Sequence, residues 1–212
     1  MEVNMNSKKG MTSRQLQAIE RRQQLLDAAK KLFAKNGYHN TSVRSITQSI
    51  GMADGLIYHY FPDGKLEILH TIFREGCEVL SEHVNKVLDG ITDEMTLNEV
   101  LVYCCEELEK TVMVDNELII VMFREKDLLG DELRQLLLHT FGKFWSVVNN
   151  LLQQRAKKGE IRQLDFEMAT HQFMTTATSK ILMKYLTSNI PQMDTDAYIE
   201  RLAEFTISPW KS

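Results

Sequence analysis

Hydrophobic residues along most of the chain recur at intervals of three and four, the spacing that places them on one face of an α-helix. In the first such segment, roughly residues 18–36, these positions are Leu25, Ala28, Ala29, Leu32 and Phe33. A left-handed cap at Asn36-Gly37 is expected to end this helix. The β-branched alternation that is typical of strands is nowhere sustained, and the chain has only three prolines and ten glycines. The pattern therefore predicts an all-α fold.

Two much shorter helical segments follow, with Gly51 between them. Thr41 stands where a side-chain oxygen can accept the free backbone N–H groups of the second helix, so we expect it to be the N-cap. The third helix, about residues 53–60, carries Ile57 four residues before Phe61, so both face inward. Two short helices joined by a tight glycine turn and backed by a longer one predict a helix-turn-helix unit.

Longer helices are expected beyond Pro62, at about residues 64–89, 96–114, 116–128, 131–158, 165–188 and 195–207. Thr96 and Glu99 fit a capping box, while Asp165 and either Asp194 or Thr195 are natural N-caps. No repeat or proline-rich linker divides the chain. We therefore expect a flexible tail (1–17), a helix-turn-helix domain (18–63) and a helical body (64–212).

The third helix is expected to turn Asp54, Leu56, Tyr58 and His59 outward. A helix fits the major groove of DNA, where base edges carry a distinct pattern of donors and acceptors. Tyr58 and His59 can donate to phosphate oxygens, while the bases are approached by the N-terminal end of the helix, formed by Ala53, Asp54, Gly55 and Leu56. The alternative is that the aromatic residues close a small core, a role that suits Phe61 and partly Tyr60.

Charge is unevenly spread along the chain, whose formal net charge is −4. Residues 1–70 hold ten Lys/Arg against six Asp/Glu, and residues 71–212 hold fifteen against twenty-three. A basic head beside an acidic body favours binding of a polyanion by the head. The same segregation argues against a helical interaction protein, whose partner surface would not require it.

Residues 21–69 resemble the DNA-binding domain of the tetracycline-repressor (TetR) family of bacterial transcription regulators. The matching positions are Ala28-Ala29, Leu32-Phe33, Gly37-Tyr38, Thr41-Ser42-Val43, Ile46, Gly51-Met52, Gly55, Ile57-Tyr58, Tyr60-Phe61, Lys65 and Ile68-Leu69. The resemblance implies a homodimeric repressor that is released from a pseudo-palindromic DNA operator by a small effector bound in the body. An activator of the same fold remains open, because the position of the operator relative to the promoter decides between the two.

The resemblance also implies individual DNA contacts. Thr41 or Ser42, together with Arg44, would touch phosphate or bases from the second helix. Tyr58 and Tyr60 occupy positions where members of the family commonly contact the DNA backbone, and Lys65 would hold a phosphate at the start of the fourth helix.

Several residues depart from the family pattern. Ala53 stands where a capping serine is common and Thr47 where alanine is usual, and the loop at residues 63–64 is one residue longer. Asp54 either caps the third helix in place of Ala53 or accepts from a cytosine amino group, and we favour the cap. The triplet Ala53-Asp54-Gly55 is similar to members that govern fatty-acid degradation in Gram-positive bacteria.

The body contains none of the sequence motifs of hydrolases, phosphate-binding loops or zinc proteases, so no enzymatic activity is expected. Glu107 near Tyr103 is the single hint of the alternative, an enzyme that processes a small molecule. Methionines and aromatic residues at helical spacing are most often plain core, but together they suit an apolar cavity. The candidate effector-pocket residues are Tyr103, Glu107, Met122, Phe123, Phe141, Phe144, Trp145, His171 and Met174. An acyl-CoA ester or another apolar ligand would fit them.

No metal, cofactor or disulfide is predicted. The three cysteines lack C-x-x-C spacing and are expected to be buried thiols, and no histidine pairs at i, i+4 with another His or Cys. No apolar run reaches the roughly 20 residues that span a bilayer, and the opening residues lack a signal-peptide pattern, which predicts a cytoplasmic protein without membrane association.

The last two predicted helices are similar to those that form a four-helix dimer interface in the family. Their small and apolar positions are Ala169, Phe173, Ala177, Ile181, Tyr185, Tyr198, Leu202 and Phe205. We expect this stripe to pack against a second subunit.

Overall fold

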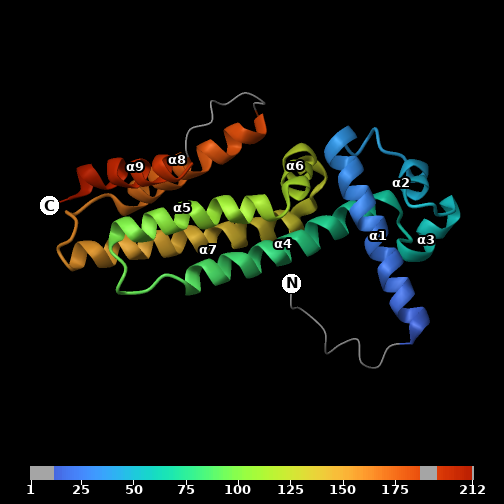
Figure 1. Cartoon of the computed structure of the whole chain (residues 1–212), viewed down its shortest axis with the longest axis horizontal. Coiled ribbons are helices and arrows are strands. Elements are labelled where there is room, and N and C mark those ends of the chain that lie inside the picture. The colour runs from blue at the N-terminus through green and yellow to red at the C-terminus, as the bar shows by residue number, and fades with distance from the viewer. Residues whose placement is uncertain (1–11, 187–194, 212) are drawn as a thin grey trace. The chain divides into compact units, whose positions relative to one another are not determined.

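The computed structural model describes residues 12–186 and 195–211, and the regular secondary structure in these ranges is helical (Figure 1). The α-helices are α1 (Ser13–Asn36), α2 (Val43–Ser49), α3 (Ile57–Tyr60), α4 (Lys65–Asp89), α5 (Leu97–Val114), α6 (Asn116–Arg124), α7 (Gly130–Lys157), α8 (Phe166–Leu186) and α9 (Thr195–Ile207). Three short 3₁₀ helices are η2 (Asp54–Leu56), η3 (Lys126–Leu128) and η4 (Ser208–Trp210). The all-α prediction is confirmed.

The chain packs as two compact units. Unit 1 comprises the described residues up to Gly76 together with Glu117–Leu133, and unit 2 comprises Cys77–Asn116 with the described residues from Arg134 onward. Unit 1 therefore contains the predicted helix-turn-helix segment, the first part of α4, and also α6 and η3. Within the described ranges, none of the helices combines the length and apolar character that crossing a membrane requires.

Unit 1 is held together by a small core to which both short helices contribute. Phe33 of α1, Ile46 of α2 and Ile57 of α3 are completely buried, and Phe61 is 1% exposed. These are the inward positions that the periodicity predicts. Burying a side chain of this size stabilises the folded state by about 1.5–3 kcal/mol, which explains how helices of one or two turns stay folded.

Two helix starts differ from the prediction. The first helix begins at Ser13 and not near residue 18, because Thr12 and Gln15 form a capping box, in which the Thr12 hydroxyl accepts from Gln15 N–H. The N-cap of α2 is Ser42, whose Oγ accepts from Ser45 N–H at 3.0 Å. Thr41 is not the cap, so that prediction was wrong.

The third helix is shorter and less regular than predicted. It opens as η2, whose N-cap residue Ala53 makes no side-chain capping bond, and continues as the single turn of α3. The predicted helix at 116–128 likewise divides into α6 and η3. We refer to Asp54–Tyr60 below as the recognition segment.

In unit 2, α5 packs against both α8 and α9 (Figure 1). The predicted capping box of Thr96 and Glu99 is present at the start of α5. The cap predicted at Asp165 is present as well, with Met168 N–H donating to Asp165 Oδ1 at 3.1 Å. Asp194 lies outside the described residues.

The apolar stripe predicted on the last two helices is divided between core and surface. Ala169, Phe173 and Ala177 are buried in the core of their own unit, which corrects their assignment to a dimer surface. Phe205 is exposed, as predicted. The side chains of Ile181 and Tyr185 lie outside what the structure describes.

Candidate nucleic-acid interface

The recognition segment presents its polar and large side chains to solvent. Leu56 is 50% exposed and Tyr58 is 53% exposed, and Ala53, Asp54, Gly55 and His59 are exposed as well. Tyr60 is partly buried, and its ring meets that of His59 edge-on at 5.2 Å. The outward orientation of Asp54, Leu56, Tyr58 and His59 that the sequence predicts is therefore confirmed.

Local packing sets the direction of Tyr58. The turn before α4 contains Gly64 with φ of +66°, and a Cβ at this glycine would lie 3.2 Å from Tyr58 Cε1. The tyrosine ring therefore rests against the bare backbone of Gly64, and the glycine satisfies both the positive φ and the close approach. This contact limits where the Tyr58 hydroxyl can point.

Beside the second helix, Ser42 and Arg44 are exposed, whereas Thr41 is 1% exposed. The Thr41 hydroxyl lies 2.8 Å from Gly37 O and 3.3 Å from Leu32 O, so it donates within unit 1. This inward bond removes the Thr41 side chain from the candidate interface. The bond holds the α1–α2 loop against α1.

Lys65 is also directed inward. Its Nζ donates to Tyr38 O and Thr41 O, both at 2.8 Å, and lies 4.0 Å from the centre of the Tyr38 ring. Burial lowers the pKa of Lys65, and the nearby Glu125 carboxylate partly offsets that change. Two of the three ammonium donors are thus engaged in tying α4 to the α1–α2 loop.

Two residues at and just after the end of α6 contact the last turn of α1 and the same loop. Glu125 is 8% exposed, and its Oε1 accepts from Tyr38 N–H at 2.9 Å. Arg124 donates from Nη1 to Ala34 O at 2.8 Å. Burial, followed by the charge of Glu125, raises the pKa of Tyr38. No pattern in the sequence indicates these contacts, which join residues about ninety positions apart.

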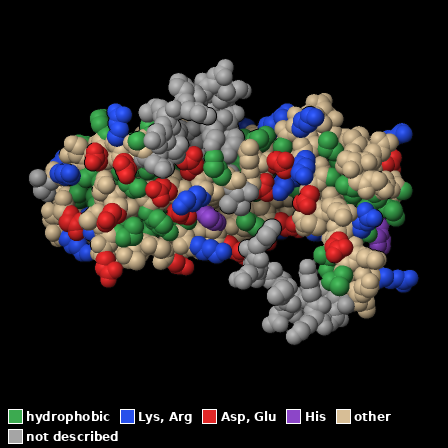
Figure 2. Space-filling model, viewed as in Figure 1, with side chains coloured by type: hydrophobic (Ala, Val, Ile, Leu, Met, Phe, Trp, Pro, Cys, Tyr) green, Lys and Arg blue, Asp and Glu red, His purple; other side chains and the backbone are tan. Residues whose placement is uncertain are grey.

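A polar hollow of about 520 Å³ adjoins the recognition segment in unit 1. It is lined by Arg14, Gln17, Ala18, Glu20, Arg21, Gln24 and Tyr60. Because α1 begins at Ser13, both arginines lie on the helix beside Tyr60. In the space-filling view, both basic and acidic side chains are visible on each of the two units (Figure 2).

The predicted effector-pocket residues fall into both units. In unit 1, Met122 is 8% exposed and Phe123 is 62% exposed. In unit 2, Phe144 is buried, while Tyr103 and Met174 pack against the core. Trp145 is partly buried, and its ring centre lies 5.5 Å from that of the exposed His171. Phe141 belongs to α7, and its side chain lies outside what the structure describes.

Tyr103 and Glu107 have partners that account for their placement. A Cβ at Gly90 would overlap the Tyr103 hydroxyl, so the ring ends against that turn. Burial and the neighbouring Glu107 raise the pKa of Tyr103. Glu107 accepts from Lys110 Nζ at 2.6 Å and lies 3.8 Å from His83 Nε2. These contacts explain the positions of both residues without a bound ligand.

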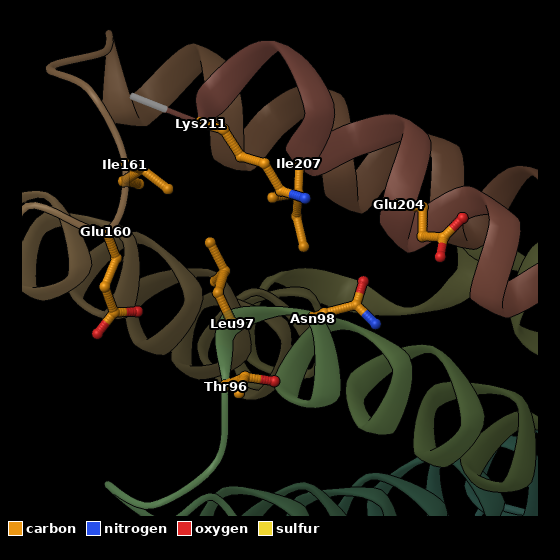
Figure 3. A pocket seen from close by; sticks show the side chains of 8 residues that line it. All are labelled: Thr96, Leu97, Asn98, Glu160, Ile161, Glu204, Ile207 and Lys211. Atoms are coloured by element: carbon orange, nitrogen blue, oxygen red, sulfur yellow. The ribbon is translucent and has the colours of Figure 1, made fainter.

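One hollow in unit 2, of about 260 Å³, is shown in Figure 3. It lies where α5 begins, beside the end of α9, with the side chains of Leu97, Ile161 and Ile207 facing inward and Glu160, Glu204 and Lys211 around them. None of the predicted pocket residues lines it. Drug-sized ligands occupy roughly 300–1,000 Å³, so this hollow is small, and its carboxylates disfavour an anionic ligand.

The described part of the chain contains no group of three or more His, Cys, Asp or Glu side chains arranged to hold a metal ion. Cys77, Cys104 and Cys105 are buried and form no disulfide with one another. Burial raises the pKa of Cys77 to about 11 and that of Cys104 to about 12. Thiols in this state are unreactive, as expected for core residues.

A tight turn between two short helices, with an exposed recognition segment on a small buried core, defines a helix-turn-helix DNA-binding protein. Comparison with protein families agrees with this class: residues 25–72 match the bacterial regulatory proteins of the tetR family, and residues 130–208 match the C-terminal domain of AefR-like transcriptional repressors. The chain belongs to the TetR family of DNA-binding transcriptional regulators. This is a family of regulators and not of enzymes.

Similar proteins include a regulator of fatty acid metabolism. The fatty acid metabolism regulator protein of Bacillus subtilis (strain 168) is 29% identical over 154 residues, which cover 72% of this chain and 77% of that protein. A crystal structure of FadR from Bacillus subtilis in complex with stearoyl-CoA is 26% identical, with a TM-score of 0.63 and coverage of 88% of this chain and 97% of that one. PfmR from Thermus thermophilus, at 20% identity and a TM-score of 0.67, covers 87% of this chain and 97% of its own and shares the fold.

Proposed function

We propose that this protein is a homodimeric transcriptional repressor that binds a pseudo-palindromic operator through its recognition segment and leaves it when a long-chain acyl-CoA ester binds. The observation that carries the proposal is the exposure of Leu56 and Tyr58 on a segment whose other face is completely buried at Ile57. Covering the exposed half of Leu56 at an interface would remove apolar area from water and so favour binding.

The proposed DNA contacts divide into two kinds. Ala53, Asp54, Gly55 and Leu56 approach base edges in the major groove, where sequence is read. Ser42, Arg44, Tyr58, His59 and Tyr60 donate to phosphates, as do Arg14 and Arg21 of the adjoining hollow. Lys65 instead acts indirectly, because its ammonium group holds the loop that leads into α2.

The proposed dimer uses the faces of α8 and α9 that point away from their own core. Met168 is 60% exposed and Phe205 is 77% exposed, the largest exposure among the large hydrophobic side chains described. In a closed two-fold dimer the two recognition segments have a fixed separation. Operator half-sites should then lie about one helical turn apart, ~34 Å.

Support for an acyl-CoA effector comes from the relatives. The Bacillus subtilis regulator that is 29% identical to this chain is named for fatty acid metabolism, and the FadR structure at 26% identity contains stearoyl-CoA. A buried acyl chain contributes roughly 0.8 kcal/mol per CH₂. Long acyl chains should therefore release the protein at lower concentrations than short ones.

The proposal is tested by selecting duplexes from a random pool with the purified protein and measuring release from the selected operator. Free coenzyme A, acetyl-CoA, octanoyl-CoA and stearoyl-CoA form the test series. We expect a palindromic consensus and a releasing concentration that falls with chain length. A consensus that no acyl-CoA displaces would contradict the effector, and the absence of any consensus would contradict operator binding itself.

A further inference from the structure

The turn between α2 and the recognition segment contains a buried hydroxyl whose partner lies on the recognition segment. Thr47 is 0% exposed, and its Oγ1 donates to Oδ1 of the exposed Asp54. The same hydroxyl lies 3.1 Å from Arg44 O and 3.2 Å from Val43 O, the ordinary local acceptors for a helical threonine. A hydroxyl has one proton, and a carboxylate is the stronger acceptor, so the bond to Asp54 dominates.

The backbone of Thr47 is held in place by hydrogen bonds to its carbonyl oxygen. Met52 N–H donates to Thr47 O at 2.8 Å and Ile50 N–H donates to the same oxygen at 3.3 Å, which closes the turn on Thr47. Both hydrogen bonds and complete burial leave Thr47 little freedom. One oxygen of Asp54 is therefore held by a buried donor, which restricts the orientations open to the carboxylate.

The structure decides against the helix-capping role expected for Asp54. The N-cap position of η2 is Ala53, which has no side-chain capping bond, and the side chain of Asp54 accepts from Thr47 instead. Since Oδ1 is engaged, a donor from outside the protein meets Oδ2. Two groups donate in the major groove, cytosine N4 and adenine N6, whereas guanine O6 and N7 and thymine O4 are acceptors that a carboxylate repels. The adenine amino group stands beside the N7 acceptor of the same base, so cytosine N4 is the donor that a carboxylate usually accepts.

We propose that Thr47 is the positioning residue for a cytosine-reading contact, in which its buried hydroxyl fixes Asp54 so that Oδ2 accepts from the N4 amino group of one cytosine in each operator half-site. The inference rests on the proposed function, because it requires the recognition segment to lie in the major groove. It assigns a role to Thr47, a residue that faces neither solvent nor DNA.

The test compares base preferences of four variants, measured by selection from a random duplex pool and by binding to operators with single base changes. Asp54→Asn keeps an acceptor for Thr47 but can offer an amide donor to the base. Thr47→Val removes the hydroxyl and keeps the shape, and Thr47→Ser keeps the hydroxyl. Ser49→Ala is the matched control, because it removes another hydroxyl of α2, one that donates to Ile46 O.

We expect the wild type to prefer cytosine at one position of each half-site. Thr47→Val should lower that preference by about three- to ten-fold, the effect of one hydrogen bond to a base edge, and leave the other positions unchanged. Asp54→Asn should move the preference at the same position away from cytosine. Thr47→Ser and Ser49→Ala should keep the wild-type profile.

A double-mutant comparison separates positioning from plain stabilisation. In an Asp54→Ala background, adding Thr47→Val should not change the base profile further, because its effect acts through the carboxylate. An equal loss of affinity for every sequence in Thr47→Val, with an unchanged profile, would reduce Thr47 to a structural residue and overturn the inference. If the wild type selects a consensus without a cytosine position, this inference fails alone, whereas failure to bind any duplex at low salt also removes the proposed function.

Discussion

The recognition segment of unit 1 and the α5–α8–α9 layer of unit 2 obtain their order in different ways. In unit 2, long helices bury a continuous core that includes Leu101, Phe173 and Ala203. The recognition segment has one completely buried residue, Ile57. Two further contacts position it: Asp54 with Thr47, and Tyr58 with Gly64. The proposed DNA-reading surface is thus built from side chains fixed by a few specific contacts, while the body depends on distributed apolar packing.

The dimer contact of the body is predicted to have the largest effect on DNA binding. Phe205→Glu places a charge on the most exposed large apolar position of α9 and should separate the subunits. Loss of bivalent binding lowers operator affinity by about 100-fold or more. Binding to a single half-site should not change. Glu200→Gln, also exposed on α9, is the control. Light scattering measures the oligomeric state, and titration of full and half operators measures the affinity for DNA. If Phe205→Glu remains a dimer, this face of α9 is not the dimer interface.

The next largest effect is expected at Glu125, which follows α6 and accepts a hydrogen bond from Tyr38 N–H in the α1–α2 loop. Glu125→Ala leaves the Tyr38 N–H without its acceptor and should destabilise unit 1 by about 2–3 kcal/mol. Glu125→Gln keeps an acceptor oxygen and should cost less than half of that. Chemical denaturation monitored by circular dichroism gives both values. Equal costs for the two variants would show that charge, and not the hydrogen bond, is what matters.

Gly64 tests whether the Tyr58 ring needs its present support. Gly64→Ala introduces a Cβ 3.2 Å from the ring at a residue with φ of +66°. Strain at such a position costs about 1–2 kcal/mol. The displaced ring should also weaken binding to all DNA sequences alike. Gly51→Ala is the comparison, because it shares the positive φ and has no atom within 4 Å of an added Cβ. An equal loss of DNA affinity in both variants would refute a role for the ring contact.

The smallest effect is expected at the start of α1. Thr12→Ala removes the cap and should cost about 0.5–1 kcal/mol in helix stability. Arg14 would then lie on a frayed first turn, so affinity for DNA of any sequence should fall slightly, with a weaker salt dependence. Thr12→Ser should behave as the wild type. A titration against salt concentration checks the prediction, and an unchanged slope would place the first turn outside the interface.

Much of the head could be predicted because its information is local. The periodicity of Leu25, Ala29 and Phe33, and the single glycine between two short segments, follow from neighbours in sequence. The outward direction of Leu56 and Tyr58 then follows from the inward direction of Ile57. The cap at Thr12 was missed because apolar periodicity, which guided the prediction, begins only some residues later.

Contacts between distant residues could not be predicted in this way. Nothing in the sequence near Glu125 indicates that its carboxylate accepts from Tyr38 N–H. A lysine at position 65 suits phosphate binding, and only the structure shows that its ammonium group donates to two backbone carbonyls instead. In the body, Ala169 and Phe173 were assigned to a dimer surface because small and apolar residues suit both an internal and an intersubunit contact. Burial alone separates the two.

Hydrogen–deuterium exchange on the intact protein, with and without its selected operator, tests most directly whether the recognition segment is the DNA-contacting surface. The operator should slow exchange at residues 42–44 and 53–60, and a shuffled duplex of equal length and salt should slow it much less. Unchanged exchange at residues 53–60, with protection confined to other regions of a protein–operator complex, would contradict the account.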